Sequence, residues 1–318
     1  MQVTFYGTRG SIAVSARDKV EYGGNTTCLR IDSPCLPAGH WLIVDAGTGL
    51  MPLSDDFMAA GGKEATILYT HYHIDHTEGF KMTPFAHVKS IPVRMIGPYE
   101  HGKGSRRVYQ EMMVSPHFPV GYGKISSHIR HWDIEFPDET LLVIHPVGGI
   151  KRIELDPYER ILRGSRQIPF DKGRKFDVGE CLVVRMHRNH HPEYANSYRF
   201  EEGPTGRTFV FVTDHENQDG IADTFRAHLA NANLLVMDCQ YTRERYERST
   251  TGYGHSTPDY VSFVARAVAA ERLGITHHDP KATDDDVDRI VAMVDERMKL
   301  TGNGVPVFGC RDYMTLAI

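Results

Sequence analysis

The sequence predicts an α/β sandwich, with two β-sheets inside and helices outside. Two observations predict it: short apolar, β-branched stretches occur in both halves of the chain, and helical patterns interleave with them in the second half. The 318 residues include 41% apolar and 24% charged residues. This composition is typical of an ordinary globular protein and excludes a disordered or fibrous one.

The first ninety residues are expected to form short strands that end in tight turns. Alternating or β-branched stretches predict strands at Val3–Tyr6, Thr26–Ile31, Trp41–Val44 and Ala65–Thr70. Asp45 directly follows the third of these strands, and His71 directly follows the fourth. Polar side chains therefore stand at strand ends in this half.

The middle of the chain, at about 84–175, is predicted to be a loop-rich insertion. It contains nine prolines and many glycines. Short strands are expected there at Val93–Ile96 and Leu141–Ile144, with one helix near Arg106–Met113. No change in composition marks a linker on either side, so residues 1–318 are expected to form a single domain.

Strands return in the second half, and helices interleave with them. The strands are expected at Cys181–Met186, Asn196–Phe200, Thr208–Thr213 and Leu234–Met237, and the helices at Gly220–Ala230, Thr257–Leu273 and Asp284–Leu300. The helix from Thr257 has the best signals, because a capping residue, a proline and an acid open it and Gly274 follows it.

Charge, hydropathy and cysteine usage limit the classes of partner. The 36 Lys and Arg against 41 Asp and Glu give a formal charge of −5, which argues against a protein that binds bulk nucleic acid. No apolar run approaches the ~20 residues of a membrane span, and no secretory signal opens the chain. Five cysteines without a C-x-x-C pair indicate reduced thiols. A cytoplasmic protein without a membrane partner is expected.

A cluster of histidines directly follows the fourth predicted strand. His71, His73, Asp75 and His76 lie within six residues, in a chain with 18 histidines. Because side chains alternate along an extended backbone, His71 and His73 would point to one side, and a turn would bring the other two to a neighbouring point. Imidazole and carboxylate groups are ligands that zinc and similar cations prefer. The pattern predicts a site for two metals; a polar loop that is merely rich in histidine is the alternative.

This H-x-H-x-D-H pattern resembles the metal motif of the metallo-β-lactamase fold. Asp45, within Ile-Val-Asp-Ala-Gly, is similar to the structural Asp of that superfamily's first motif. The segments Phe5–Ser11 and Tyr22–Thr27 resemble the branch that holds ribonuclease Z and PhnP-like phosphodiesterases. The resemblance implies the αββα sandwich of that fold.

The resemblance also implies metal ligands in the second half of the chain. His190 and His191 are both candidates for the third motif, and the spacing to the following tyrosine favours His191. His277 and His278 are candidates for the last motif, and the Thr-His order favours His277. Asp214 ends an apolar strand and would bridge the metals. The implied set is His71, His73 and His191 on one metal, Asp75, His76 and His277 on the other, and Asp214 between them.

The implied cofactors are two divalent metal ions, with zinc favoured over manganese or iron. A hydroxide held on such metals would attack a phosphodiester, and Asp75 would orient it or accept its proton. His255, in a Gly-His-Ser-Thr sequence similar to that of ribonuclease Z-like enzymes, would protonate the leaving group. The alternative for His255 is a residue at the start of a helix that only packs.

The sequence therefore predicts a binuclear metal-dependent hydrolase, a phosphodiesterase that acts on a small or cyclic nucleotide-like phosphodiester. A small-molecule substrate is preferred to tRNA because the chain is acidic and shows no evident basic, glycine-rich arm. Two alternatives stay open: a hydrolase of a lactone, thioester or β-lactam carbonyl, and a non-catalytic metal-bearing protein that binds or senses redox state. A homodimer is a further expectation, because relatives often form dimers.

Overall fold

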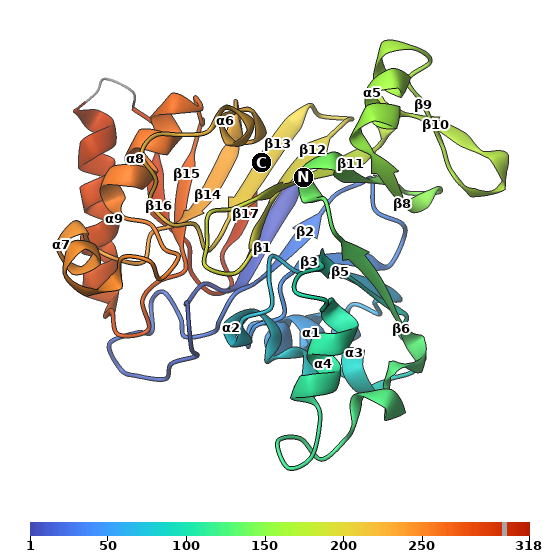
Figure 1. Cartoon of the computed structure of the whole chain (residues 1–318), viewed down its shortest axis with the longest axis horizontal. Coiled ribbons are helices and arrows are strands. Elements are labelled where there is room, and N and C mark those ends of the chain that lie inside the picture. Colours follow the sequence, from blue (N-terminus) through green and yellow to red (C-terminus); the bar gives the residue numbers. More distant parts are fainter. Residues whose placement is uncertain (301–303) are drawn as a thin grey trace.

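Two β-sheets stack face to face, and helices cover their outer faces (Figure 1). The computed structural model describes residues 1–300 and 304–318. The first sheet has the strand order β17-β1-β2-β3-β4-β5-β6, and the second has the order β16-β15-β14-β13-β12-β11-β7-β8. The predicted αββα sandwich is confirmed.

The first sheet is parallel in the part that leads to the histidine cluster. Its strands are β1 (Gln2–Gly7), β2 (Cys28–Asp32), β3 (His40–Val44), β4 (Glu64–Leu68), β5 (Val93–Pro98), β6 (Ile129–Ile134) and β17 (Thr315–Ala317). Strands β3 to β6 run parallel, whereas β1 pairs antiparallel with β2 and β17. The carboxyl ends of β3 and β4 therefore meet at one edge, with Asp45 beside Thr70.

The second sheet is likewise parallel on the side that carries the later polar residues. Its strands are β7 (Thr140–His145), β8 (Gly149–Glu154), β11 (Leu182–Arg188), β12 (Asn196–Glu202), β13 (Arg207–Val212), β14 (Leu234–Asp238), β15 (Leu273–Thr276) and β16 (Val307–Gly309). Strands β13 to β16 run parallel. Asp214, Asp238 and His277 consequently lie at the same edge of this sheet.

The main core lies between the two sheets. Inward-facing side chains of the first sheet, such as Phe5 and Leu42, pack against those of the second, such as Val184, Phe200 and Phe209, and all five are fully buried. Burying each such side chain contributes roughly 1.5–3 kcal/mol to folding. This core fixes the two sheets relative to each other and thus the two edges that carry polar residues.

Helices cover both outer faces, which bury further apolar clusters. The first sheet is covered by α1 (Leu50–Ala59), α3 (Pro84–His87) and α4 (Ser105–Met112), and the second by α6 (Asp223–Leu229), α8 (Pro258–Ala267) and α9 (Asp284–Lys299). The short helices α2 (Ile74–Thr77) and α7 (Arg243–Arg245) lie in loops. Among the described residues, no helix is long and apolar enough to cross a membrane.

The helix predicted at 257–273 is shorter than expected. It ends at Ala267, and Ala269 takes a left-handed backbone conformation with φ of 54°. The following alanine-rich segment favours a helix by propensity. It instead closes onto the loop before β14, where the Asn231 N–H donates to the Val268 carbonyl and the Glu271 N–H donates to that of Ala232. Tertiary contacts therefore override local preference here.

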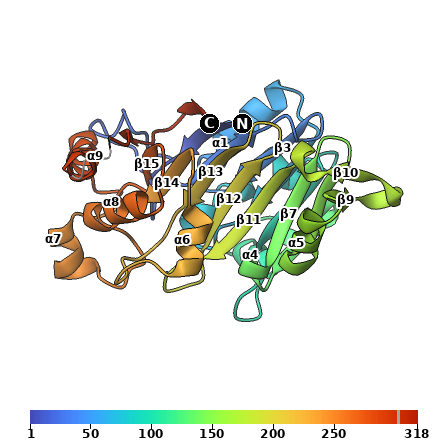
Figure 2. The ribbon, with the colours of Figure 1, turned by 90° about the horizontal axis from the view of Figure 1, so that it is seen from above.

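The middle segment at about 84–175 is only partly loop, because it supplies β5 and β6 to one sheet and β7 and β8 to the other. The single domain over 1–318 stays a prediction. Residues 149–177 lie at one edge of the second sheet and comprise β8, α5 (Leu155–Arg163), β9 (Gln167–Pro169) and β10 (Lys175–Asp177). β8 pairs with β7, buried side chains of the segment pack on β7 and β11, and the β9–β10 hairpin projects (Figures 1 and 2). We call this segment the 149–177 arm.

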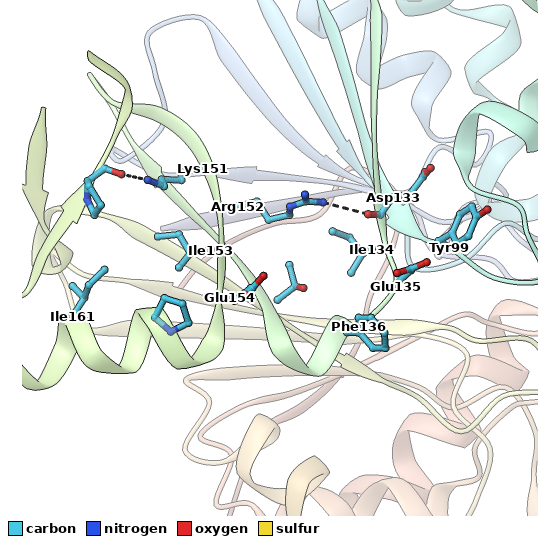
Figure 3. Close-up of a pocket in the computed structure, with 13 residues that line it drawn as sticks. Tyr99, Asp133, Ile134, Glu135, Phe136, Lys151, Arg152, Ile153, Glu154 and Ile161 are labelled. Carbon is cyan, nitrogen blue, oxygen red and sulfur yellow. Dashed lines mark hydrogen bonds between the residues drawn. The ribbon is translucent and has the colours of Figure 1, made fainter. Parts of the chain in front are cut away.

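A cavity of about 900 Å³ lies at the base of the 149–177 arm (Figure 3). Its two basic side chains are engaged with the backbone: Lys151 donates to the Pro169 carbonyl and Arg152 to that of Asp133. Asp133, Glu135 and Glu154 also line it, and none of the predicted site residues does. The cavity is therefore separate from the histidine cluster.

Candidate metal centre

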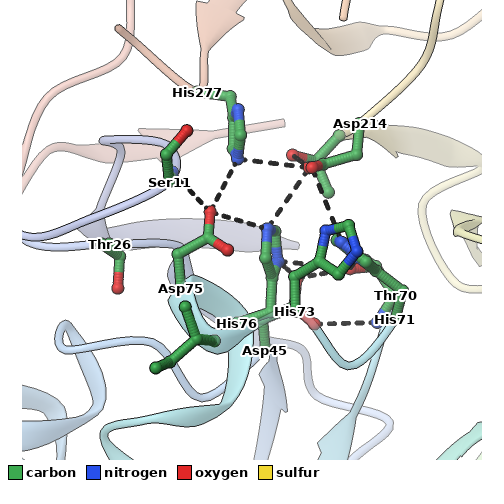
Figure 4. A network of polar contacts seen from close by, with 12 residues as sticks. Ser11, Thr26, Asp45, Thr70, His71, His73, Asp75, His76, Asp214 and His277 are labelled. Atoms are coloured by element: carbon green, nitrogen blue, oxygen red, sulfur yellow. Dashed lines mark hydrogen bonds and ion pairs between the residues drawn. The ribbon is translucent and has the colours of Figure 1, made fainter. Parts of the chain in front are cut away.

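Asp45 holds the turn that carries the first histidines (Figure 4). This fully buried carboxylate accepts hydrogen bonds from the Thr70 N–H and the Thr70 hydroxyl, both at 2.8 Å. It also lies 2.9 Å from His76 Nδ1. The structural role expected of Asp45 is thereby visible: it ties the end of β4 to α2 and turns the opposite nitrogen of His76 toward the cluster.

One group of polar atoms joins the two halves of the chain. Ligand-type atoms of His71, His73, His191 and Asp214 all lie within 4.8 Å of one another. Asp214 Oδ2 is 3.6 Å from His71 Nε2 and 3.7 Å from His191 Nε2. The structure therefore brings together the residues that the sequence assigns to the first metal.

A second group shares Asp214 with the first. Asp75, His76 and His277 have ligand-type atoms within 4.8 Å of one another. Asp75 Oδ2 lies 3.3 Å from His76 Nε2 and 3.2 Å from His277 Nε2, and Asp214 Oδ1 lies 3.3 Å from each of these nitrogens. The two oxygens of Asp214 thus face different groups, as expected of a bridging carboxylate.

The sequence left two choices open, between His190 and His191 and between His277 and His278, and the structure distinguishes the members of each pair. His191 and His277 belong to the clusters, whereas His190 and His278 do not. His278 points into the protein, where its Nε2 donates to the Cys310 carbonyl at 2.7 Å, and burial lowers its pKa to about 3. The preferences for His191 and His277 therefore agree with the placement of the side chains.

The donor set fits divalent cations. In the described part of the chain, His71 Nε2 is buried without a hydrogen-bond partner and His76 Nε2 faces two carboxylates at 3.3 Å, although buried imidazole nitrogens are normally satisfied by a hydrogen bond. Their other ring nitrogens contact Thr70 and Asp45, and His191 Nδ1 donates to the Glu193 carbonyl at 2.8 Å. Such outer partners orient imidazole ligands toward a metal.

The pKa values of the histidines differ between the two groups. Burial lowers the pKa of His71, His73 and His191, which keeps these imidazoles in the neutral form that binds metals. Burial also opposes a charge on His76, but the carboxylates of Asp75, Asp214 and Asp45 raise its pKa well above the usual value. Metal binding must therefore displace a proton from His76.

His255 lies beside this centre and is held by Asp238. His255 Nδ1 is 2.8 Å from Asp238 Oδ2, and the Ser256 N–H donates to Asp238 Oδ1 at 2.8 Å. The His255 ring stacks on that of His277 with centroids 4.9 Å apart. Although burial lowers the pKa of His255, Asp238 outweighs it, and the pKa rises to about 9.

Asp238 and Glu216 are site residues that the sequence reasoning missed. Asp238 ends the apolar strand β14 much as Asp214 follows β13, so the repetition of this pattern was the available signal. Glu216 is buried and accepts hydrogen bonds from the Tyr246 hydroxyl and from the N–H groups of Gly252 and Gly254. It fixes the loop that leads to His255, and no local pattern marks it.

Three residues at strand ends share an unusual backbone conformation. Asp45, Asp214 and His277 have φ of 60°, 51° and 59°. Left-handed backbone is unfavourable for residues other than glycine and costs roughly 1–2 kcal/mol, less for Asp. The site therefore holds its backbone in a strained state, as functional sites commonly do.

Comparison with known proteins gives relatives over nearly the whole chain. Ribonuclease Z of Brevibacillus brevis is 24% identical over 315 residues, covering 91% of this chain and 88% of that protein. Ribonuclease Z of Clostridium acetobutylicum is 22% identical over 298 residues, covering 88% of each. No protein-family model matches the sequence.

Solved structures agree with these relatives. The metallo-β-lactamase fold protein YhfI from Bacillus subtilis superposes with a TM-score of 0.63 at 17% identity, over 99% of this chain and 98% of that one. The chain has the metallo-β-lactamase fold. Human tRNase Z, short form, has a TM-score of 0.58 at 18% identity, and a diphosphatase from the PhnP family has 0.59 at 15%, each over 100% of this chain and 99% and 97% of its own.

This metallo-β-lactamase fold protein resembles ribonuclease Z and PhnP-like enzymes, as predicted from its motifs. The expected class, a metal-dependent phosphodiester hydrolase, is confirmed by the ribonuclease Z relatives. The His and Asp clusters could hold divalent metal ions.

The expectation of no bulk nucleic acid partner is wrong. The relatives are ribonucleases, and one structural neighbour is named for tRNA. Net charge was misleading because it averages over the chain: residues 149–177 carry eight Lys and Arg against five Asp and Glu, although the whole chain is at −5.

Proposed function

We propose that this protein hydrolyses phosphodiester bonds of RNA at a centre of two divalent metals, zinc most readily. The proposal depends on the position of the Asp214 carboxylate between the two clusters of histidines. One of its oxygens faces the first cluster and the other faces the second, at 3.3–3.7 Å from the imidazole nitrogens. We assign His71, His73 and His191 to one metal and Asp75, His76 and His277 to the other. The narrower substrate, a small or cyclic nucleotide-like diester, stays a prediction.

Bound metals would make water acidic enough to attack at neutral pH and would offset charge on the phosphate. Asp75 is positioned to hold or accept the proton of the attacking water, because the Ser11 N–H donates to its Oδ2 at 2.6 Å and fixes it. Its pKa is well below the usual value: burial opposes the charge, but His76 and His277 favour it more strongly. Asp75 is therefore ionised and able to orient that water.

His255 supplies the proton for the leaving oxygen. Its Nδ1 is committed to Asp238, so Nε2 is the nitrogen that can donate. With a pKa of about 9, the imidazole is protonated at neutral pH, which is the state a general acid requires. Phosphodiester hydrolysis needs such an acid because an alkoxide leaves poorly.

The 149–177 arm supports RNA as the substrate. Arg152, Arg160, Arg163 and Arg166 are exposed on it. Exposed cations that are close together in one segment attract the phosphate backbone without reading sequence. An acidic body with a basic arm would direct RNA binding to one part of the surface.

The proposal is tested with the protein loaded with zinc or manganese and offered an RNA with a 3′ extension, a generic phosphodiester, a lactone, a thioester and a β-lactam. We expect hydrolysis of the diesters, with RNA preferred, and a loss of rate in Asp75→Ala. Turnover of carbonyl substrates alone would establish the first alternative. Metal uptake without any turnover would establish a binding or redox-sensing protein. A cytoplasmic location and a homodimer stay predictions.

A further inference from the structure

A second cavity, of about 740 Å³, lies beside the segment that follows Asp214 in the chain. Its lining includes His190, Gln218, Asp219, Ile221 and Tyr246. His190 is the chain neighbour of His191, and the 217–222 segment begins three residues after Asp214. Among the described residues, no member of the two clusters lines it, so its relation to the centre depends on the contacts of its walls.

Hydrogen bonds fix one wall of this cavity to the centre. Glu216 accepts from the Tyr246 hydroxyl and from the Gly254 N–H, so the ring of Tyr246 and the start of the His255 segment are held by one buried carboxylate. Gly254 lies directly against His191: a Cβ atom there would come within 2.1 Å of the imidazole Cδ2. The wall is therefore positioned relative to the centre.

The opposite wall is fixed in the same way. Asn217 accepts a hydrogen bond from the Thr257 N–H and donates to the Thr257 hydroxyl, both at 3.1 Å. Thr257 is two residues beyond His255. The Tyr260 hydroxyl donates to the Gly220 carbonyl at 3.4 Å and anchors the far end of the loop. Because Asn217 is already engaged, Gln218 and Asp219 are the side chains left to contact a ligand.

The lining suits a nucleoside rather than a second phosphate. Among the described residues, no Lys or Arg lines the cavity, and the carboxylate of Asp219 would repel an anion. The half-buried ring of Tyr246 and the side chain of Ile221 offer apolar surface, on which a base can stack. The amide of Gln218 can pair with a base edge, and Asp219 can accept from amino or hydroxyl groups.

We propose that this cavity binds the nucleoside adjacent to the scissile phosphate, with its base on Tyr246 and its polar edge on Gln218 and Asp219. The inference rests on the proposed function and deepens it, because it makes the enzyme selective for nucleotide diesters over other phosphodiesters. The residues involved determine specificity and take no part in bond cleavage.

The test compares two ligands that share a phosphate and a ribose, adenosine monophosphate and ribose 5-phosphate, by calorimetry on the metal-loaded protein. We expect adenosine monophosphate to bind about tenfold more tightly, which is within the usual contribution of one stacked base. The ratio of the two affinities should fall toward one in Tyr246→Leu and in Gln218→Ala. In Tyr246→Phe, which retains the ring, most of the preference for adenosine monophosphate should remain. Glu244→Gln on α7 serves as a matched control outside the cavity.

Equal affinities in the wild-type protein, or a ratio unchanged in both variants, would overturn the inference. Hydrolysis is measured in parallel, so the two proposals fail separately. A preserved ratio without hydrolysis of any diester would sink the proposed function and leave the nucleoside site standing. Hydrolysis of diesters without any preference for adenosine monophosphate would overturn the nucleoside site and leave the proposed function standing.

Discussion

The two halves of the chain contribute to the candidate metal centre in different ways. The first half supplies His71, His73, Asp75 and His76 from a single turn after β4. The second half supplies one residue at a time: His191 from the β11–β12 connection, Asp214 after β13 and His277 after β15. The first arrangement depends on local backbone geometry, and the second depends on which strands are neighbours.

This difference teaches where sequence reasoning works. Parallel strands place their carboxyl ends at one edge, so residues far apart in the chain meet there. Asp214, Asp238 and His277 meet because β13, β14 and β15 are adjacent. Variants in the two halves should therefore fail in different ways, and the following predictions run from the largest expected effect to the smallest.

Asp214→Ala should have the largest effect, because this residue faces both groups. We expect activity to fall by more than about 10³-fold, at or beyond the range seen when one group that stabilises the transition state electrostatically is removed. Metal content, measured by mass spectrometry, should fall at both positions. Asp285→Ala at the exposed start of α9 is the control, and a protein that kept two metals would contradict the bridging role.

His255→Ala should leave metal content intact and slow the chemical step. We expect kcat on RNA to fall by about 10²-fold, the lower end of general acid catalysis. A diester with a p-nitrophenolate leaving group, which needs less protonation, should be affected less. Tyr253→Phe, at an exposed neighbouring position, is the control. Equal losses on both substrates would argue for a packing role instead.

Asp45→Asn tests the first half, where one residue supports the whole turn. Loss of an outer partner of a metal ligand commonly lowers metal affinity by about 10–100-fold. We expect a loss of this size, measured by competition with a zinc chelator. Asp32→Asn, whose carboxylate is half-exposed and pairs with Arg30, should change nothing. An unchanged zinc affinity would show that His76 is oriented by other contacts.

Asp238→Asn should change the pH profile more than the maximal rate. The wild-type rate should fall as pH rises through about 9, because His255 then loses the proton it must donate. Asp238 raises that pKa, so its neutral replacement should move the descending limb to lower pH. The measurement is kcat against pH on RNA, and a limb that stayed in place would assign it to another group.

Changes in the 149–177 arm should give the smallest effect. Arg160→Gln with Arg163→Gln should raise KM for RNA severalfold and lower the salt dependence of binding by about one unit for each phosphate that is no longer neutralised. A generic small diester should be cleaved as before. Arg289→Gln on α9 is the matched control, and equal salt slopes for both proteins would remove the arm from RNA binding.

Much of the fold and site was predictable because the decisive signals are local. The strand ends at Asp45, His71 and Asp214 could be identified from apolar runs, and the choice of His191 and His277 agrees with the structure. Asp238 was missed although it ends a strand much as Asp214 does, and Glu216 could not be assigned because its role depends on contacts between distant loops. The local excess of Lys and Arg in residues 149–177 was missed since net charge conceals an uneven distribution.

The left-handed conformations of Asp45, Asp214 and His277 set a limit on how this protein can be improved. A substitution by glycine would lower the backbone strain at each position by roughly 1 kcal/mol. It would also remove the side chain that the candidate metal centre needs. Selection for thermal stability alone would therefore favour variants that are more stable but inactive. Engineers who seek a tougher enzyme should look to the helices and leave these three strand ends untouched.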